Sequence, residues 1–223
     1  MTRTLSQPPA ISLDHGQHFV LEDATWELYE KLLRDIGDRP VRVTYDDGRM
    51  EIMSPLAEHE DVKKLIGRMI EMLTFLLDMP VKSLGSTTFR RKDKAKGLEP
   101  DECYYFRDEA KMRGRKRLDL RKDPPPELVV EVDVTHRSVA RLPIYSALGV
   151  PEIWRFDGIR LACLHLKGKE YAVRKMSLAF PFLEPALLNQ FIDQRAHQGE
   201  TLIIKAFIAW VRKNGWIPPT SAE

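Results

Sequence analysis

The chain has 223 residues, and its 35 Lys and Arg against 33 Asp and Glu give a formal net charge of +2. A chain of this length buries about 70% of its unfolded surface and forms a core without disulfides or metals. Hydrophobic residues make up 43%, and no apolar run approaches about 18 residues, which excludes a membrane-spanning or fully disordered protein.

The first predicted elements are a helix and a hairpin. Thr25 can cap a helix that Gly37 ends. Apolar and polar residues then alternate over 41–52 around a turn at Gly48. This alternation predicts two antiparallel strands, because glycine tolerates the positive φ of a tight hairpin turn.

A long helix and two strands are expected next. Apolar residues recur every three or four positions from 58 to 78, which predicts an amphipathic helix of about five turns. Residues 86–91 and 100–106 are predicted strands. They are joined by a basic, glycine-bearing segment at 92–97.

The strongest strand signal is the β-branched run at 128–134, which is typical of a buried central strand. Ser138 can cap a helix over 139–148, and residues 150–156 form the next predicted strand. A crossover of this kind makes the two strands parallel neighbours in one sheet.

The C-terminal part is predicted to contain two strands and two helices, at residues 161–166, 171–174, 186–192 and 202–211. The fold class is therefore α/β, with a central mixed β-sheet flanked by helices. We expect a single domain over 20–215, between tails at 1–19 and 216–223.

The two cysteines, Cys103 and Cys163, lie 60 positions apart, without the spacing of a metal motif. They are too few for a disulfide framework, so we expect both to be reduced. Residues 1–10 are polar and lack the apolar core of a secretory signal, which makes the cytoplasm the expected compartment.

Two acidic residues interrupt the apolar run of the central strand. Glu131 and Asp133 are two positions apart, so they share one face of that strand. Buried like charges repel unless a cation lies between them. Asp101 follows Pro100 at the start of the preceding strand, where it can meet Glu131. Three converging carboxylates suit Mg²⁺ or Mn²⁺. The alternative is that Asp133 points outward and Glu131 pairs with an arginine.

This arrangement resembles the PD-(D/E)xK nuclease superfamily. That superfamily carries an Asp on one core strand, and a Glu and a Lys two positions apart on the next. Here Pro100 and Asp101 are followed after 30 residues by Glu131, and a helix bearing Arg141 comes next.

The residues also resemble the Uma-type restriction endonuclease family. The matching stretches are 98–105, 126–132 and 145–154, which ends in Gly-Val-Pro-Glu-Ile-Trp, and the approach to the long helix at 53–59. The resemblance spans about 20 to 190. It implies a restriction-endonuclease-like three-layer core and metal-dependent hydrolysis of phosphodiester bonds in DNA.

The resemblance implies Asp101, Glu131 and Asp133 as metal ligands for Mg²⁺ or Mn²⁺. Asp133 stands where the superfamily motif has Lys. In many Uma-type relatives that Lys lies on the following helix, and Arg141 is the aligned residue. Arginine cannot act as a general base, but it can stabilise charge on the phosphate. Glu58 is a further catalytic candidate that could position the water, although a glutamate at a helix start is also favoured by the helix dipole.

His59 and His136 are weaker candidates, because a single histidine is more often a solvated or core residue. Aromatic residues in the strands are expected to be core, and the apolar stripe over 202–210 to be a core or dimer face. Basic side chains flank Asp101 over 90–96 and 107–117, which favours DNA as partner. Charge runs also solvate loops, and acidic residues dilute the second segment.

A homodimer is expected by analogy, since cleavage of both DNA strands favours two-fold symmetry. Two other functions stay open. One is a nuclease-like module, inactivated at Asp133 and Arg141, that binds nucleic acid or protein. The other is a structural or regulatory protein with a plain cation site.

Overall fold

The computed structural model describes residues 18–217 except 38, 55–56, 116–117 and 134–138. Its strands form two sheets. Sheet A has the order β1-β3-β2-β6-β5 and consists of β1 (His18–Leu21), β2 (Arg42–Asp46), β3 (Arg49–Met53), β5 (Phe89–Arg91) and β6 (Lys96–Leu98). Sheet B has the order β11-β10-β9-β8-β7-β4 and consists of β4 (Lys82–Ser83), β7 (Glu102–Tyr105), β8 (Leu128–Val132), β9 (Glu152–Phe156), β10 (Leu161–Lys167) and β11 (Glu170–Arg174).

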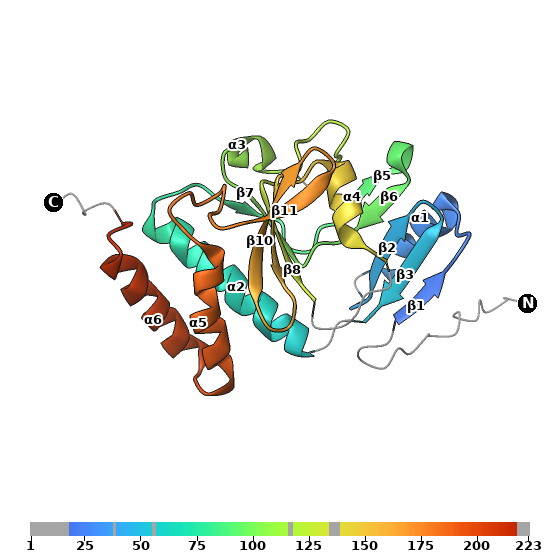
Figure 1. Ribbon diagram of the computed structural model, residues 1–223. Coiled ribbons are helices and arrows are strands. Elements are labelled where there is room, and N and C mark those ends of the chain that lie inside the picture. The colour runs from blue at the N-terminus through green and yellow to red at the C-terminus, as the bar shows by residue number, and fades with distance from the viewer. Residues whose placement is uncertain (1–17, 38, 55–56, 116–117, 134–138, 218–223) are drawn as a thin grey trace, which may run out of the picture.

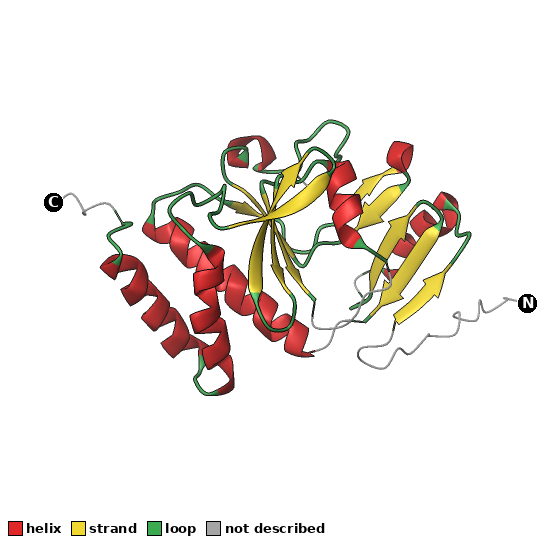
Figure 2. Ribbon diagram, viewed as in Figure 1, coloured by secondary structure: helices red, strands yellow, loops and turns green. Residues whose placement is uncertain are grey.

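The α-helices are α1 (Trp26–Ile36), α2 (Ala57–Leu76), α3 (Glu109–Met112), α4 (Arg141–Leu148), α5 (Asn189–Ile192) and α6 (Glu200–Lys213). Short 3₁₀ turns lie at η1 (Lys92–Lys94), η2 (Pro185–Leu188) and η3 (Asp193–Ala196). Figure 1 shows α2, α5 and α6 on one side of sheet B, and α4 on the other. Figure 2 shows the strands of sheet A as a group separate from those of sheet B.

The alternation of side chains along β8 explains this layering. Val130 and Val132 belong to the core cluster that includes Leu65 of α2 and Phe207 of α6. Val129 belongs instead to the cluster that includes Ile144 of α4. Sheet B therefore has helices on both faces, and the predicted α/β fold with a three-layer core is confirmed.

The N-terminal helix and hairpin form as the sequence predicts. The Thr25 hydroxyl accepts a hydrogen bond of 3.2 Å from the Leu28 N–H at the start of α1. Gly37 ends the helix with φ at +57°. The β2–β3 turn has positive φ at Asp47 and Gly48, which is the backbone that a tight hairpin needs.

The predicted crossover is also present. β8 pairs with β9 in parallel, and α4 connects them. The other described strand pairs are antiparallel. α4 begins at Arg141, with Ala140 at its N-cap. Ser138, the expected cap, lies outside the described residues.

Three short elements have no counterpart in the prediction, namely β1, β4 and α3. The basic segment at 92–97 also differs, because it turns through η1 into β6. That strand pairs with β5 and places Gly97 opposite Tyr45 of β2. Elements of two to four residues are too short for a periodic signal, and their pairing partners determine them.

Both cysteines and four of the strand aromatics are buried. Cys103 and Cys163 are both free thiols. Tyr104, Tyr105, Trp154 and Phe156 are at most 1% exposed, so they pack in the core. None of the helices in the described ranges combines the length and apolar content that crossing a bilayer requires.

Candidate active site

Asp101 and Glu131 meet across the junction of β7 and β8. The antiparallel register pairs Glu102 with Val130, and one further step places Asp101 opposite Glu131. Side chains opposite each other in such a pair have Cβ atoms about 5 Å apart. Asp101 is fully buried and Glu131 is 4% exposed. The register thus places the two acidic residues opposite each other at the end of the β7–β8 pair. Their joint role as metal ligands stays a prediction.

Each oxygen of Asp101 has partners from other elements. Oδ1 accepts a short hydrogen bond from Nη1 of Arg42, on β2. Oδ2 accepts a hydrogen bond of 2.6 Å from the Val132 N–H. The Arg42 guanidinium also donates to the Pro100 carbonyl, at 3.2 Å. Strand β2 of sheet A thus supplies the counter-charge for a carboxylate at the edge of β7.

Glu131 pairs with the second arginine of the site. Arg141 Nη2 donates to Glu131 Oε1 at 2.8 Å, and the Tyr145 hydroxyl donates a shorter hydrogen bond to the same oxygen. Arg141 also contacts the Glu99 carbonyl and, at 3.4 Å, Thr44 Oγ1. Burial lowers the pKa of Arg141, but Glu131, Tyr145 and Asp101 together outweigh this effect and raise the pKa, so Arg141 is charged. This ion pair is the alternative that the sequence analysis left open for Glu131, while the catalytic role of Arg141 stays a prediction.

Burial also shifts the pKa values of the side chains next to Arg141 and Glu131. Burial, together with Glu131, raises the pKa of Tyr145 well above its ordinary value, so its hydroxyl stays a donor. Burial likewise raises the pKa of Glu99. Arg141 Nε is buried and has no hydrogen-bond partner among the described residues.

A cavity of about 370 Å³ opens beside these groups. Its wall includes Glu131, Asp133, Arg141, Tyr145 and Arg155. Asp133 is half-buried and its N–H donates to the Phe156 carbonyl at 2.7 Å. The parallel register pairs Glu131 with Arg155, so β9 adds a further cation to this wall. Asp133 therefore lines the same cavity as Glu131.

The long helix α2 carries two of the predicted candidates, Glu58 and His59. Glu58 lies in the first turn of α2, but its side chain is outside the described set, so its role stays a prediction. His59 is 2% exposed, and its Nε2 lies 3.0 Å from Asp101 Oδ2 without the alignment of a hydrogen bond. His136 also lies outside the described residues.

Sequence reasoning missed Arg42, Thr44 and Arg155. Arg42 and Thr44 lie on β2, a hairpin strand whose sequence shows only an alternation of apolar and polar residues. A sequence signal exists for Arg155, because it stands on the strand expected to run parallel to Glu131. No local pattern indicates Arg42, since its contact with Asp101 spans 59 positions of the chain.

Asp101 and Glu131 carry the oxygen ligands that suit a hard divalent ion, but both carboxylates are already paired with arginines. Carboxylate oxygens from facing strands are the ligands that Mg²⁺ prefers. Yet Arg42 and Arg141 already compensate the charges of Asp101 and Glu131. An ion at Glu131 would therefore exchange with the guanidinium of Arg141.

Most described basic side chains of the two segments that flank Asp101 in the sequence are paired with acids. Ion pairs join Arg91 to Asp93, Lys92 to Glu27, Lys96 to Asp46, Lys111 to Asp108, Arg113 to Glu109 and Arg115 to Asp123. Arg90 is exposed, whereas Lys116 and Arg117 lie outside the described residues. The two basic segments thus offer less unpaired charge to a nucleic acid than the sequence indicates.

Comparison with known proteins gives a family. No curated protein matches the chain. A solved structure, the crystal structure of a "putative nuclease belonging to DUF820" from Anabaena variabilis, is similar with a TM-score of 0.44 and 10% sequence identity, over 74% of this chain and 90% of that one. The Uma2 family, described as "Putative restriction endonuclease", matches residues 26–194. The chain therefore belongs to the Uma2 family.

Proposed function

We propose that the protein is an endonuclease that hydrolyses phosphodiester bonds in DNA and depends on a divalent metal ion. The observation that carries this proposal is a cavity lined by Glu131, Asp133 and Arg141. Asp101 lies one residue beyond the Glu102–Val130 pair, next to this cavity wall. Membership in the Uma2 family supports it.

Asp101 and Glu131 would hold the ion, with Asp133 as the next carboxylate on the cavity wall. A bound Mg²⁺ or Mn²⁺ lowers the pKa of a water and polarises the phosphate. Other residues of the chain hold the two carboxylates in position. Asp101 is fixed by the Val132 N–H, and Tyr145 fixes one oxygen of Glu131.

Arg141 is suited to the charge that develops on the phosphate. It is charged, it lines the cavity, and its Nε has no partner among the described groups. A guanidinium released from Glu131 can donate two parallel hydrogen bonds to phosphate oxygens. Arg155 lines the same wall and adds a second positive charge.

The test is cleavage of supercoiled, single-stranded and branched DNA with Mg²⁺ or Mn²⁺. We expect cleavage by the wild type, none with EDTA, and background activity for Asp101→Asn and Glu131→Gln. Asp35→Asn is the matched control, since its carboxylate is exposed on α1 and should not alter cleavage. Circular dichroism identifies any variant that has lost its fold.

Two results would overturn the proposal. Cleavage that persists in folded Asp101→Asn would place the chemistry elsewhere or in a contaminant. DNA binding without cleavage by the wild type, lost at moderate salt, would establish a binding module. The two arginine pairs are the feature of the structure that favours that second function. Light scattering during purification tests the proposed homodimer.

A further inference from the structure

A second cluster of chemically active side chains lies on the opposite face of sheet B. Glu152 begins β9, and Cys163 and His165 lie two positions apart on β10. The antiparallel register pairs Glu152 with His165 and Cys163 with Trp154, which places the three side chains on one face. Trp154 and Cys163 belong to the core on the α2 side, whereas the candidate active site lies on the α4 side.

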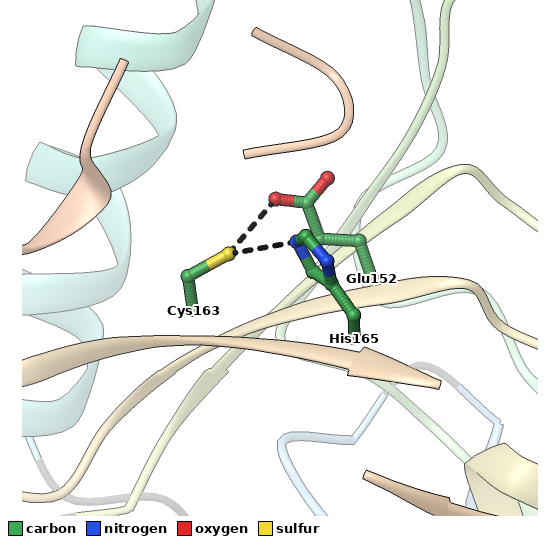
Figure 3. Close-up of side chains that lie close together, drawn as sticks. All are labelled: Glu152, Cys163 and His165. Carbon is green, nitrogen blue, oxygen red and sulfur yellow. Dashed lines mark hydrogen bonds between the residues drawn. The ribbon is translucent and has the colours of Figure 1, made fainter. Parts of the chain in front are cut away.

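The three side chains converge on a small volume (Figure 3). Cys163 Sγ lies 3.2 Å from Glu152 Oε1 and 3.4 Å from His165 Nε2. One ligand atom from each residue lies within 4.8 Å of the others. Glu152, Cys163 and His165 are thus described residues whose side chains are gathered closely enough to hold a metal ion.

We propose that Glu152, Cys163 and His165 bind a zinc ion. Sulfur, imidazole nitrogen and carboxylate oxygen are its preferred ligands, with bonds of about 2.0–2.3 Å. In a tetrahedral site, bonds of that length separate neighbouring ligand atoms by about 3.3–3.6 Å. The two sulfur distances in the structure are close to this range, and the Glu152 and His165 ligand atoms lie within 4.8 Å of each other.

Charge supports the same assignment. A thiolate and a carboxylate together cancel the double charge of the ion, which matters at a site where Glu152 is fully buried and Cys163 is 2% exposed. His165 is half-buried, so the site has an exposed side. The Met176 carbonyl lies 3.6 Å from the sulfur and, like a water, could supply the fourth ligand.

The carboxylate is already held in place by outer contacts. Trp154 Nε1 donates to Glu152 Oε1 at 2.7 Å, and the N–H groups of Leu178 and Ala179 donate to Oε2 at 2.9 Å each. Fixed orientation of this kind is typical of metal ligands. The same contacts attach the 178–179 loop to the sheet, so the ion would stabilise that loop.

Metal binding must displace the thiol proton. Burial and the neighbouring Glu152 carboxylate raise the pKa of Cys163. The S–H therefore donates to Glu152 in the metal-free protein, and the ion takes the place of that proton. Affinity should increase as the pH rises, because the proton competes with the metal.

The experiment titrates the reduced, tag-free full chain with Co²⁺ and with Zn²⁺ against a chromophoric chelator. We expect one equivalent of tightly bound Zn²⁺ and a thiolate-to-cobalt charge-transfer band with Co²⁺. Cys163→Ser should lose the band, and His165→Gln should weaken Zn²⁺ binding at least about tenfold. Thermal melting with and without Zn²⁺ checks that both variants fold.

Matched controls use the chain's other cysteine and an exposed histidine. Cys103→Ser and His197→Gln should bind Zn²⁺ as the wild type does. Absence of stoichiometric binding in the folded wild type overturns the proposal. So does unchanged binding in either Cys163→Ser or His165→Gln. Since these readouts do not involve DNA, the proposal and the nuclease assignment can fail separately.

Discussion

Arg141 compensates the buried charge of Glu131, and its replacement should show how much stability that pair contributes. Arg141 is 8% exposed and Glu131 is 4% exposed. Their Nη2–Oε1 contact is 2.8 Å. Removing one partner of a buried pair leaves an uncompensated charge, which is far more costly than losing a surface pair.

We therefore expect Arg141→Ala to lower the free energy of unfolding by about 3–5 kcal/mol at neutral pH. Urea denaturation measures this change. The double variant Arg141→Ala/Glu131→Gln should recover part of the loss, because the remaining side chain is then neutral. An equal loss in the single and double variants would contradict the assigned pairing.

Glu102 supplies a pH-dependent test at the edge of the site. Burial raises the pKa of Glu102, while Lys63 and Lys64 lower it by less. A carboxyl whose folded pKa is raised binds its proton more tightly in the native state, so its contribution to stability decreases as the pH rises above its ordinary value of 4.5.

Glu102→Gln should therefore be more stable than the wild type at pH 7. The difference should shrink as the pH falls toward 4, where both folded and unfolded carboxyls become protonated. Thermal unfolding across this pH range measures it. A Glu102→Gln protein that is less stable at pH 7 would show that the carboxylate makes a favourable contact.

At this scale the sequence indicated half of the candidate site. Glu131 and Asp133 were detectable because acidic residues interrupt the apolar run of a strand, and Asp101 because it follows Pro100 at the start of the preceding strand. The partner of Asp101 was not, because Arg42 reaches it from a strand of the other sheet. A buried counter-charge carries no local pattern of its own.

At the scale of elements, the packing of α1 on sheet A depends on one glycine. Tyr29 of α1 is fully buried and stacks on Tyr45 of β2, with ring centroids 5.2 Å apart. A Cβ added at Gly97 of β6 would lie 2.6 Å from Tyr29 Cζ. The glycine thus leaves the space that the Tyr29 ring occupies.

We expect Gly97→Ala to destabilise the protein by about 1–3 kcal/mol, as overpacking of a core does. Chemical denaturation measures the loss. Gly199→Ala is the control, because a Cβ there meets nothing within 4 Å. Gly199 is the N-cap of α6, where alanine is less favourable than glycine, so this variant should cost no more than about 1 kcal/mol. Equal effects of the two substitutions would contradict the packing described here.

Elements with long periodic signals were predictable, and short ones were not. α2 spans 20 residues, and its apolar spacing gave its bounds to within two residues. β8 and its crossover to β9 followed from the β-branched run and the capped helix. β4 has two residues and exists because β7 offers it a pairing edge, which no local pattern contains.

At the scale of the whole molecule, the candidate site depends on three parts meeting. β2 of sheet A brings Arg42, β7 and β8 of sheet B bring Asp101 and Glu131, and α4 brings Arg141. The sequence predicted the three-layer sheet B and the family. The sequence did not show that the strands of sheet A form a separate sheet, because hairpin strands have the same alternation of apolar and polar residues in either sheet.

Crystals grown with Mn²⁺ test the central claim most directly, through anomalous difference density. We predict a peak about 2.1 Å from carboxylate oxygens of both Asp101 and Glu131, with Arg141 moved off Glu131. A protein that cleaves DNA with Mn²⁺, yet shows no peak there and keeps Arg141 on Glu131, would contradict this account.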